Sequence, residues 1–120
     1  MSLTKEELIQ RVGEDLSLVP IGQALENHDV LRIEATYTEV YQRIKKAGKA
    51  TWAFADEVPD EAVPYVALMV EEKLLTSYSV PESRYNRIKN DAGPNGDQAL
   101  RDLSEASLND YESINDDVDF

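Results

Sequence analysis

Residues 30–44, VLRIEATYTEVYQRI, carry the most regular apolar pattern of the chain. Apolar side chains recur there at alternating steps of three and four residues, which places them on one face of an α-helix. The residues of this face are Val30, Ile33, Tyr37, Val40 and Ile44. Two lysines and a glycine follow closely, as is common at a helix C-terminus. The segment therefore predicts a long amphipathic helix with one side packed against a core.

A shorter helix is expected upstream of this segment. Thr4 and Glu7 have the spacing of a capping box, in which each side chain bonds to the other residue's backbone amide at a helix start. Leu8, Val12 and Leu16 then follow at helical spacing and predict the buried face of this first helix.

Downstream, residues 59–75 form the most apolar of the expected helices. Pro64 has no amide hydrogen and is tolerated only in a first turn, so we expect this helix to begin near residues 59–61. Its main stripe comprises Val63, Val66, Ala67, Val70 and Leu74. A helix this apolar is expected at the centre of the fold.

The remaining segments of the chain carry weaker signals of structure. Trp52 and Phe54 lie on one side of a short extended piece and predict a loop anchored by aromatic burial. Pro81 can open a further helix, and residues 93–96, GPNG, are a strong turn signal before a last short helix capped by Asp97. The expected apolar faces of these two helices are Tyr85, Ile88 and Ala92, and then Leu100 and Leu103.

Together these signals predict an all-α protein, a small bundle of four to five helices over residues 1–107. Residues 108–120 contain five acidic and no basic residues, and we expect a disordered acidic C-terminal tail there. The predicted core comprises Val12, Leu16, Ile33, Tyr37, Val40, Ile44, Trp52, Val63, Val66, Val70 and Leu74.

The net charge of the chain excludes some classes of binding partner. It has 24 acidic against 12 basic residues, a formal net charge of −12, and so repels nucleic-acid phosphates and anionic lipids. No apolar run approaches the roughly 20 residues of a membrane span, and the first residues do not resemble a secretion signal. We therefore expect a cytoplasmic protein that binds neither membranes nor specific nucleic-acid sequences.

Catalytic chemistry has few candidate residues here. The chain has no cysteine, and its one histidine, His28, is interpreted as an exposed residue at a helix start. The acidic pairs Glu71–Glu72 and Asp116–Asp117 are interpreted as solvated faces, because adjacent residues on a helix point about 100° apart. We predict no catalytic residue, no metal ligand and no cofactor, and hence no enzyme.

The sequence offers more candidate residues for binding another macromolecule than for catalysis. Arg84, Arg87 and Lys89 form a basic group that is expected to pair with carboxylates, either within the chain or on a partner. In the tail, apolar residues punctuate the acids, a pattern typical of segments that order against a partner. These candidates for a partner interface are Tyr111, Ile114, Val118 and Phe120.

The order of elements resembles a known family. The start TKEELI at residues 4–9, the long second helix, Trp52, then VPDE at residues 58–61 and SVPESR at residues 79–84 resemble the head–tail adaptor proteins of tailed double-stranded DNA bacteriophages, also called connector or head-completion proteins. The resemblance covers roughly residues 4–92. The turn at residues 93–96 and the acidic end depart from the family's pattern, so no contacts are transferred to residues after Ala92.

This resemblance implies a structural role in virion assembly. Proteins of that family are small helical bundles, and the resemblance implies a ring of about twelve subunits beneath the portal. Such a ring requires head-to-tail contacts that close on themselves. The implied partners are the portal protein, tail components and further copies of the chain, with packaged DNA passing through the ring. The implied location is the virion, after synthesis in the cytoplasm of the bacterial host.

Two other hypotheses remain at this point. The chain is alternatively an acidic regulatory or inhibitor module, encoded by a phage or plasmid, that acts through its C-terminal tail. An enzyme ranks third. If a ring forms, its contacts are expected between residues 84–89 of one copy and an acidic stretch of the next, either residues 56–61 or residues 110–119.

Overall fold

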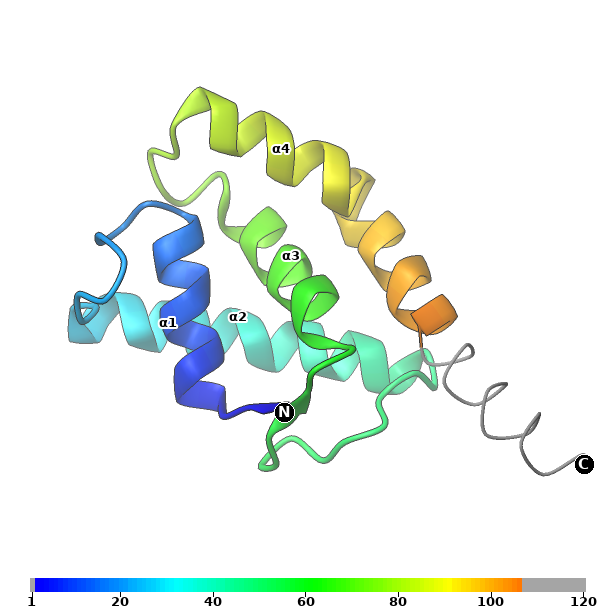
Figure 1. Ribbon diagram of the computed structural model, residues 1–120. Helices are drawn as coiled ribbons and strands as arrows, with labels where there is room; N and C mark the ends of the chain where they lie inside the picture. Colours follow the sequence, from blue (N-terminus) through cyan, green and yellow to red (C-terminus); the bar gives the residue numbers. More distant parts are fainter. Residues whose placement is uncertain (1, 107–120) are drawn as a thin grey trace, which may run out of the picture.

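A computed structural model describes residues 2–106, which fold into a small all-α bundle (Figure 1). The elements in chain order are β1 (Ser2–Leu3), α1 (Lys5–Asp15), α2 (Asn27–Lys46), β2 (Val58–Pro59), α3 (Val63–Leu74), α4 (Glu82–Ala92) and the 3₁₀ turn η1 (Pro94–Gly96). Residues 97–106 form a further helical segment. The predicted fold class is therefore confirmed, while the expected acidic tail, residues 108–120, lies outside the described residues.

The predicted N-terminal cap of α1 is present. Thr4 Oγ1 accepts a hydrogen bond of 3.1 Å from the amide of Glu7, and the Thr4 amide donates one of 3.0 Å to Glu7 Oε1. These bonds satisfy two amides that have no partner within the helix.

The helix α3 lies at the centre of the bundle, as its apolar composition predicts. It packs against α1, α2 and α4 (Figure 1). It begins at Val63 rather than near residues 59–61, because Val58 and Pro59 pair with Leu3 and Ser2 in a short antiparallel ladder. Pro64 occupies the first turn, where its missing amide hydrogen costs no helical bond.

All eleven residues of the predicted core are buried, with exposed fractions of 7 % or less. Trp52 lies in an aromatic cluster with Tyr37, Tyr41 and Phe54. Its indole donates a hydrogen bond of 3.1 Å to the Tyr37 hydroxyl, and the Tyr41 hydroxyl donates one of 2.7 Å to the Trp52 carbonyl. The loop that contains Trp52 is thus held by ring contacts and by two buried hydrogen bonds, although it is not extended.

The turn after α4 is fixed to the end of α2. Gly93 and Asn95 both have positive φ, which reverses the chain in a few residues. Arg43 donates hydrogen bonds to the Asn95 carbonyl and to Asp97. Ala99 and Leu103 of the following helical segment are fully buried. Residues 97–106 are thereby anchored on the bundle rather than projecting from it.

None of the helices in residues 2–106 is both long and apolar enough to cross a membrane.

Candidate functional site: an arginine groove

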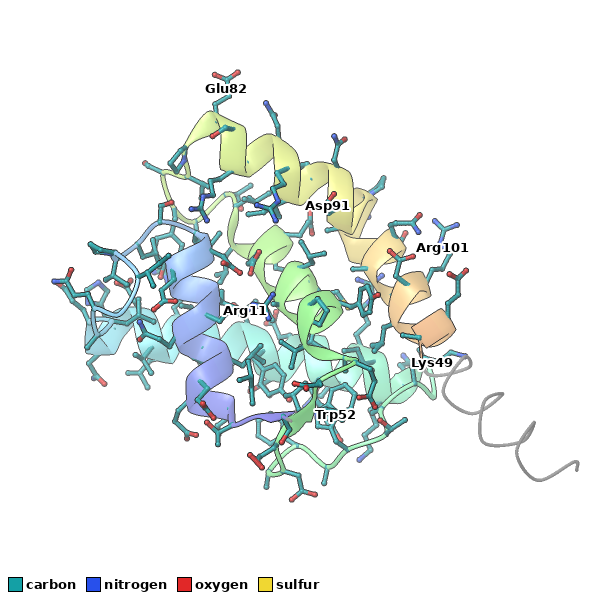
Figure 2. All side chains as sticks on the ribbon, in the orientation of Figure 1. Arg11, Lys49, Trp52, Glu82, Asp91 and Arg101 are labelled. Atoms are coloured by element: carbon teal, nitrogen blue, oxygen red, sulfur yellow. The ribbon has the colours of Figure 1, made fainter. Side chains whose placement is uncertain are left out.

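A hollow of about 250 Å³ between α1, α3 and α4 gathers charged side chains from all three helices. Its apolar lining comes mainly from α3 and α4. Its charged lining comprises Arg11 and Asp15 of α1, Glu71 of α3, and Arg84, Arg87 and Asp91 of α4. We call this hollow the arginine groove. Figure 2 labels Arg11 on α1 and Asp91 on α4, with α3 between the two helices.

The three arginines of the groove have unused donor capacity. Arg84 Nη1 donates a hydrogen bond of 3.0 Å to the backbone carbonyl of Asp15. Arg11 Nε lies 3.7 Å from Asp15 Oδ2, and Arg87 Nε lies 3.9 Å from Asp91 Oδ2. Both of these distances exceed that of a hydrogen bond, so they are loose ion pairs within one helix. Each guanidinium carries five N–H donors, most of which remain available to another group.

Glu71 lies at the base of the groove and is 3 % exposed. Its Oε2 is buried and accepts no hydrogen bond from residues 2–106. Burial raises the pKa of Glu71 to about 10, aided by its hydrogen bond with Asp15 and the charge of Asp15, while Arg11 and Arg87 oppose the rise. At neutral pH Glu71 is therefore uncharged, and the groove holds three positive charges against two negative ones.

The interpretation of Glu71–Glu72 as a solvated pair is wrong for Glu71. α1 and α4 both pack against α3, and the side of α3 that carries Glu71 faces the hollow between them. Glu72 also has little contact with solvent, since its side chain is 10 % exposed and accepts a hydrogen bond of 3.0 Å from Lys89 Nζ. Burial of one acid among arginines creates a site that the sequence analysis missed.

The predicted interface residues divide into three groups. Arg84 and Arg87 line the groove together, with Arg11 as a third arginine that the sequence did not single out. Lys89 is on the same helix but its ammonium group pairs with Glu72 instead. Tyr111, Ile114, Val118 and Phe120 lie outside the described residues.

Two large apolar side chains are exposed among residues 2–106. Ile21, in the loop between α1 and α2, is 88 % exposed, and Leu31 of α2 is 56 % exposed. Leu31 lies off the apolar face of its helix, so the spacing of apolar residues did not indicate it. Single exposed apolar residues are normal on a protein surface and define no site by themselves.

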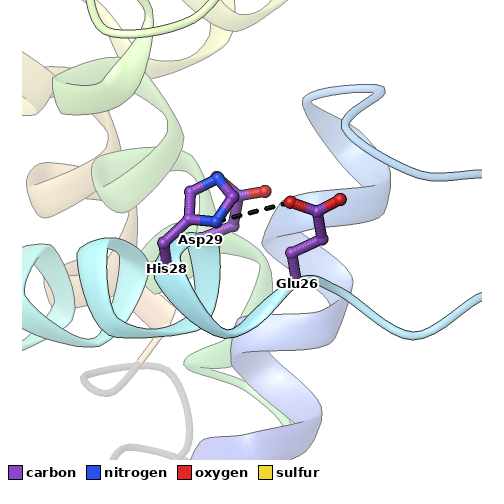
Figure 3. Close-up of side chains that lie close together, drawn as sticks. All are labelled: Glu26, His28 and Asp29. Atoms are coloured by element: carbon purple, nitrogen blue, oxygen red, sulfur yellow. Dashed lines mark ion pairs between the residues drawn. The ribbon is translucent and has the colours of Figure 1, made fainter.

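A second polar cluster surrounds His28 at the start of α2 (Figure 3). His28 Nδ1 lies 3.4 Å from Glu26 Oε2, and His28 Nε2 lies 3.3 Å from Asp29 Oδ1. These three side chains are close enough to ligate one metal ion. The His28 side chain is 73 % exposed, as expected of a residue at a helix start.

Asp29 in this cluster already has a partner. The Tyr78 hydroxyl donates a hydrogen bond of 2.9 Å to Asp29 Oδ1, the atom that also faces His28. Burial, this hydrogen bond and the negative charge of Asp29 raise the pKa of Tyr78 to about 12. The cluster therefore fastens the segment after α3 to the start of α2, and its open, water-exposed geometry provides no second argument for a metal.

Comparisons with protein-family models, with curated proteins and with solved structures found no match for this chain. The assignment of a site therefore rests on the geometry of the arginine groove itself.

Proposed function

We propose that this chain is a non-catalytic head–tail connector of a tailed double-stranded DNA bacteriophage, an adaptor that links the portal to the tail by forming a ring that extends the DNA channel. The single observation that supports it most is the arginine groove. A protein with a net charge of −12 collects three arginines around one hollow, which is the arrangement expected of a contact surface for a carboxylate-bearing partner.

The fold and the surface charge are compatible with this role. The all-α bundle agrees with the fold that the sequence resemblance implies. A ring also needs two different surfaces on each subunit, and the groove is one of them. Asp56, Glu57 and Glu61, in and after the loop that leads to α3, are exposed and offer an acidic second surface. An acidic ring would let packaged DNA pass without adhering to it.

The alternative role, an acidic regulatory or inhibitor module, depends on residues 108–120. Those residues lie outside the described part of the chain, and no contact within residues 2–106 favours this alternative. The connector role is therefore the one proposed.

Electron microscopy of a mixture tests the proposal. The purified chain is mixed with the portal protein encoded nearest to it in its genome, and the particles are imaged by negative staining. We expect an additional ring below the portal that shares the portal's symmetry. The variant Arg84→Glu/Arg87→Glu should not form this ring at low salt, whereas Arg101→Glu, an exposed arginine outside the groove, should. Unchanged portal particles at high protein concentration would contradict the proposal.

A further inference from the structure

One oxygen of Glu71, at the base of the arginine groove, has no hydrogen-bond partner among residues 2–106, although the carboxyl group also bonds to Asp15. Glu71 Oε2 is buried and receives no hydrogen bond from residues 2–106, and the residue as a whole is 3 % exposed. An acceptor left in this state destabilises the folded chain unless a donor reaches it. The occupant of the groove should therefore bring an N–H or O–H group to its base.

The rim of the groove presents hydrogen-bond donors, so it requires an acceptor from the occupant. Arg11, Arg84 and Arg87 present N–H donors around the hollow, and two of these side chains make only loose ion pairs within their own helices. Two arginines on adjacent turns of a helix can grip one carboxylate with several parallel hydrogen bonds. The occupant should therefore also carry an acceptor with negative charge.

Charge and size restrict the occupant further. Asp15 and Asp91 balance two of the three arginines, so a single negative charge neutralises the groove. A basic side chain would supply a donor to Glu71 but would have to lie among three guanidiniums. The volume of about 250 Å³ is below the range of about 300–1,000 Å³ typical of drug-sized ligands, and suits one side chain with its adjoining backbone.

We propose that the arginine groove binds an aspartate or glutamate side chain of a partner polypeptide, with the carboxylate on Arg84 and Arg87. A backbone N–H beside it donates to Glu71 Oε2, which is buried in the free chain, once the Glu71 carboxyl group turns toward the hollow. This inference rests on the proposed function only in naming the partner as another protein of the virion. The recognition itself depends on the described residues alone. It also explains why a buried acid lies beneath three arginines, because the neutral carboxyl group accepts the amide that accompanies the bound carboxylate.

Nuclear magnetic resonance with small probes tests this recognition without any portal. The probes are N-acetylglutamate N-methylamide, its uncharged glutamine counterpart, the lysine counterpart, acetate and inorganic phosphate. We expect the glutamate probe to shift the Nε–H signals of Arg11, Arg84 and Arg87 saturably, with a dissociation constant of about 1–10 mM, as suits a contact of few atoms. Acetate, which has no N–H group, should bind at least about threefold more weakly.

Three variants assign the contacts. Arg84→Gln/Arg87→Gln should weaken binding of the glutamate probe by at least about tenfold, and Arg101→Gln should leave it unchanged. Glu71→Leu removes the acceptor, so the glutamate probe should then bind no more tightly than acetate. The dispersion of the backbone amide signals shows whether each variant is folded.

Several results would overturn the inference. These are equal shifts from the glutamine counterpart, tighter binding of the lysine counterpart or of phosphate, and no saturable shift from any probe at tens of millimolar. Binding of the glutamate probe without a ring on the portal would instead reject the connector role and leave the recognition intact. A ring that forms equally well with Arg84→Gln/Arg87→Gln would show that the connector assembles through another surface.

Discussion

Replacing Glu71 by leucine should stabilise the protein, and by an amount that grows with pH. The pKa of this carboxyl group rises from 4.5 to about 10 on folding. Between these values the folded chain holds a proton that the unfolded chain has released. The free energy of unfolding of the wild type therefore falls as pH rises, by about 1.4 kcal/mol per pH unit for this group.

The size of the effect at neutral pH follows directly. Below pH 4.5 the Glu71 carboxyl group is protonated in both the folded and the unfolded chain, so it adds no pH dependence there. At pH 7 it has lowered the free energy of unfolding of the wild type by about 3 kcal/mol relative to that plateau. Leucine has no proton to hold, so the loss is absent from Glu71→Leu. Removing the buried Oε2, which accepts no hydrogen bond from residues 2–106, adds at most about 1–3 kcal/mol, and the loss of the hydrogen bond with Asp15 offsets part of this gain.

Urea unfolding at pH 5, 6, 7 and 8 measures this difference. Fluorescence of Trp52, the one tryptophan, reports the transition because this residue is buried. Glu39→Leu is the matched control, since Glu39 is on a helix and its side chain is 70 % exposed. A gap between Glu71→Leu and wild type that stays constant across these pH values, or that matches the control, would refute the account of a buried neutral acid.

Three further predictions concern other parts of the chain. Trp52→Ala should lower the free energy of unfolding by roughly 3–5 kcal/mol, measured by denaturant titration followed by circular dichroism, because a buried ring and two hydrogen bonds are lost. Arg43→Ala should cost about 0.5–1.5 kcal/mol and speed amide hydrogen exchange in residues 97–106, because it removes the partly exposed bonds to Asn95 and Asp97. Removing residues 109–120 should leave the melting temperature nearly unchanged but weaken binding to the portal in a pull-down assay; a large drop in melting temperature, or equal binding, would contradict this.

The helices were predictable because their signals are local. The steps of three and four residues in α2 and the Thr4–Glu7 capping box of α1 depend only on residues within a few turns of one another. The later start of α3 was not predictable in this way, because Val58 pairs with Leu3, a residue more than fifty positions away. Such a short ladder leaves no periodic pattern in the sequence.

The arginine groove escaped prediction for a similar reason. It joins Arg11, Glu71 and Arg87 from three helices, and no local pattern records their meeting. One signal for Glu71 was present, however. It follows Ala67 by four positions and precedes Leu74 by three, so it shares the buried face of α3 with both. The angle of about 100° between adjacent helical residues, which suggested two solvated acids, lets Glu71 face inward while Glu72 points elsewhere.

Native mass spectrometry of the portal with this chain tests most directly whether the protein acts by assembly. The account predicts a complex that gains a fixed number of copies, in simple ratio to the portal subunits, and that loses them when Arg84 and Arg87 are both reversed to glutamate. A portal of unaltered mass beside free chain, across low to moderate salt, would contradict it.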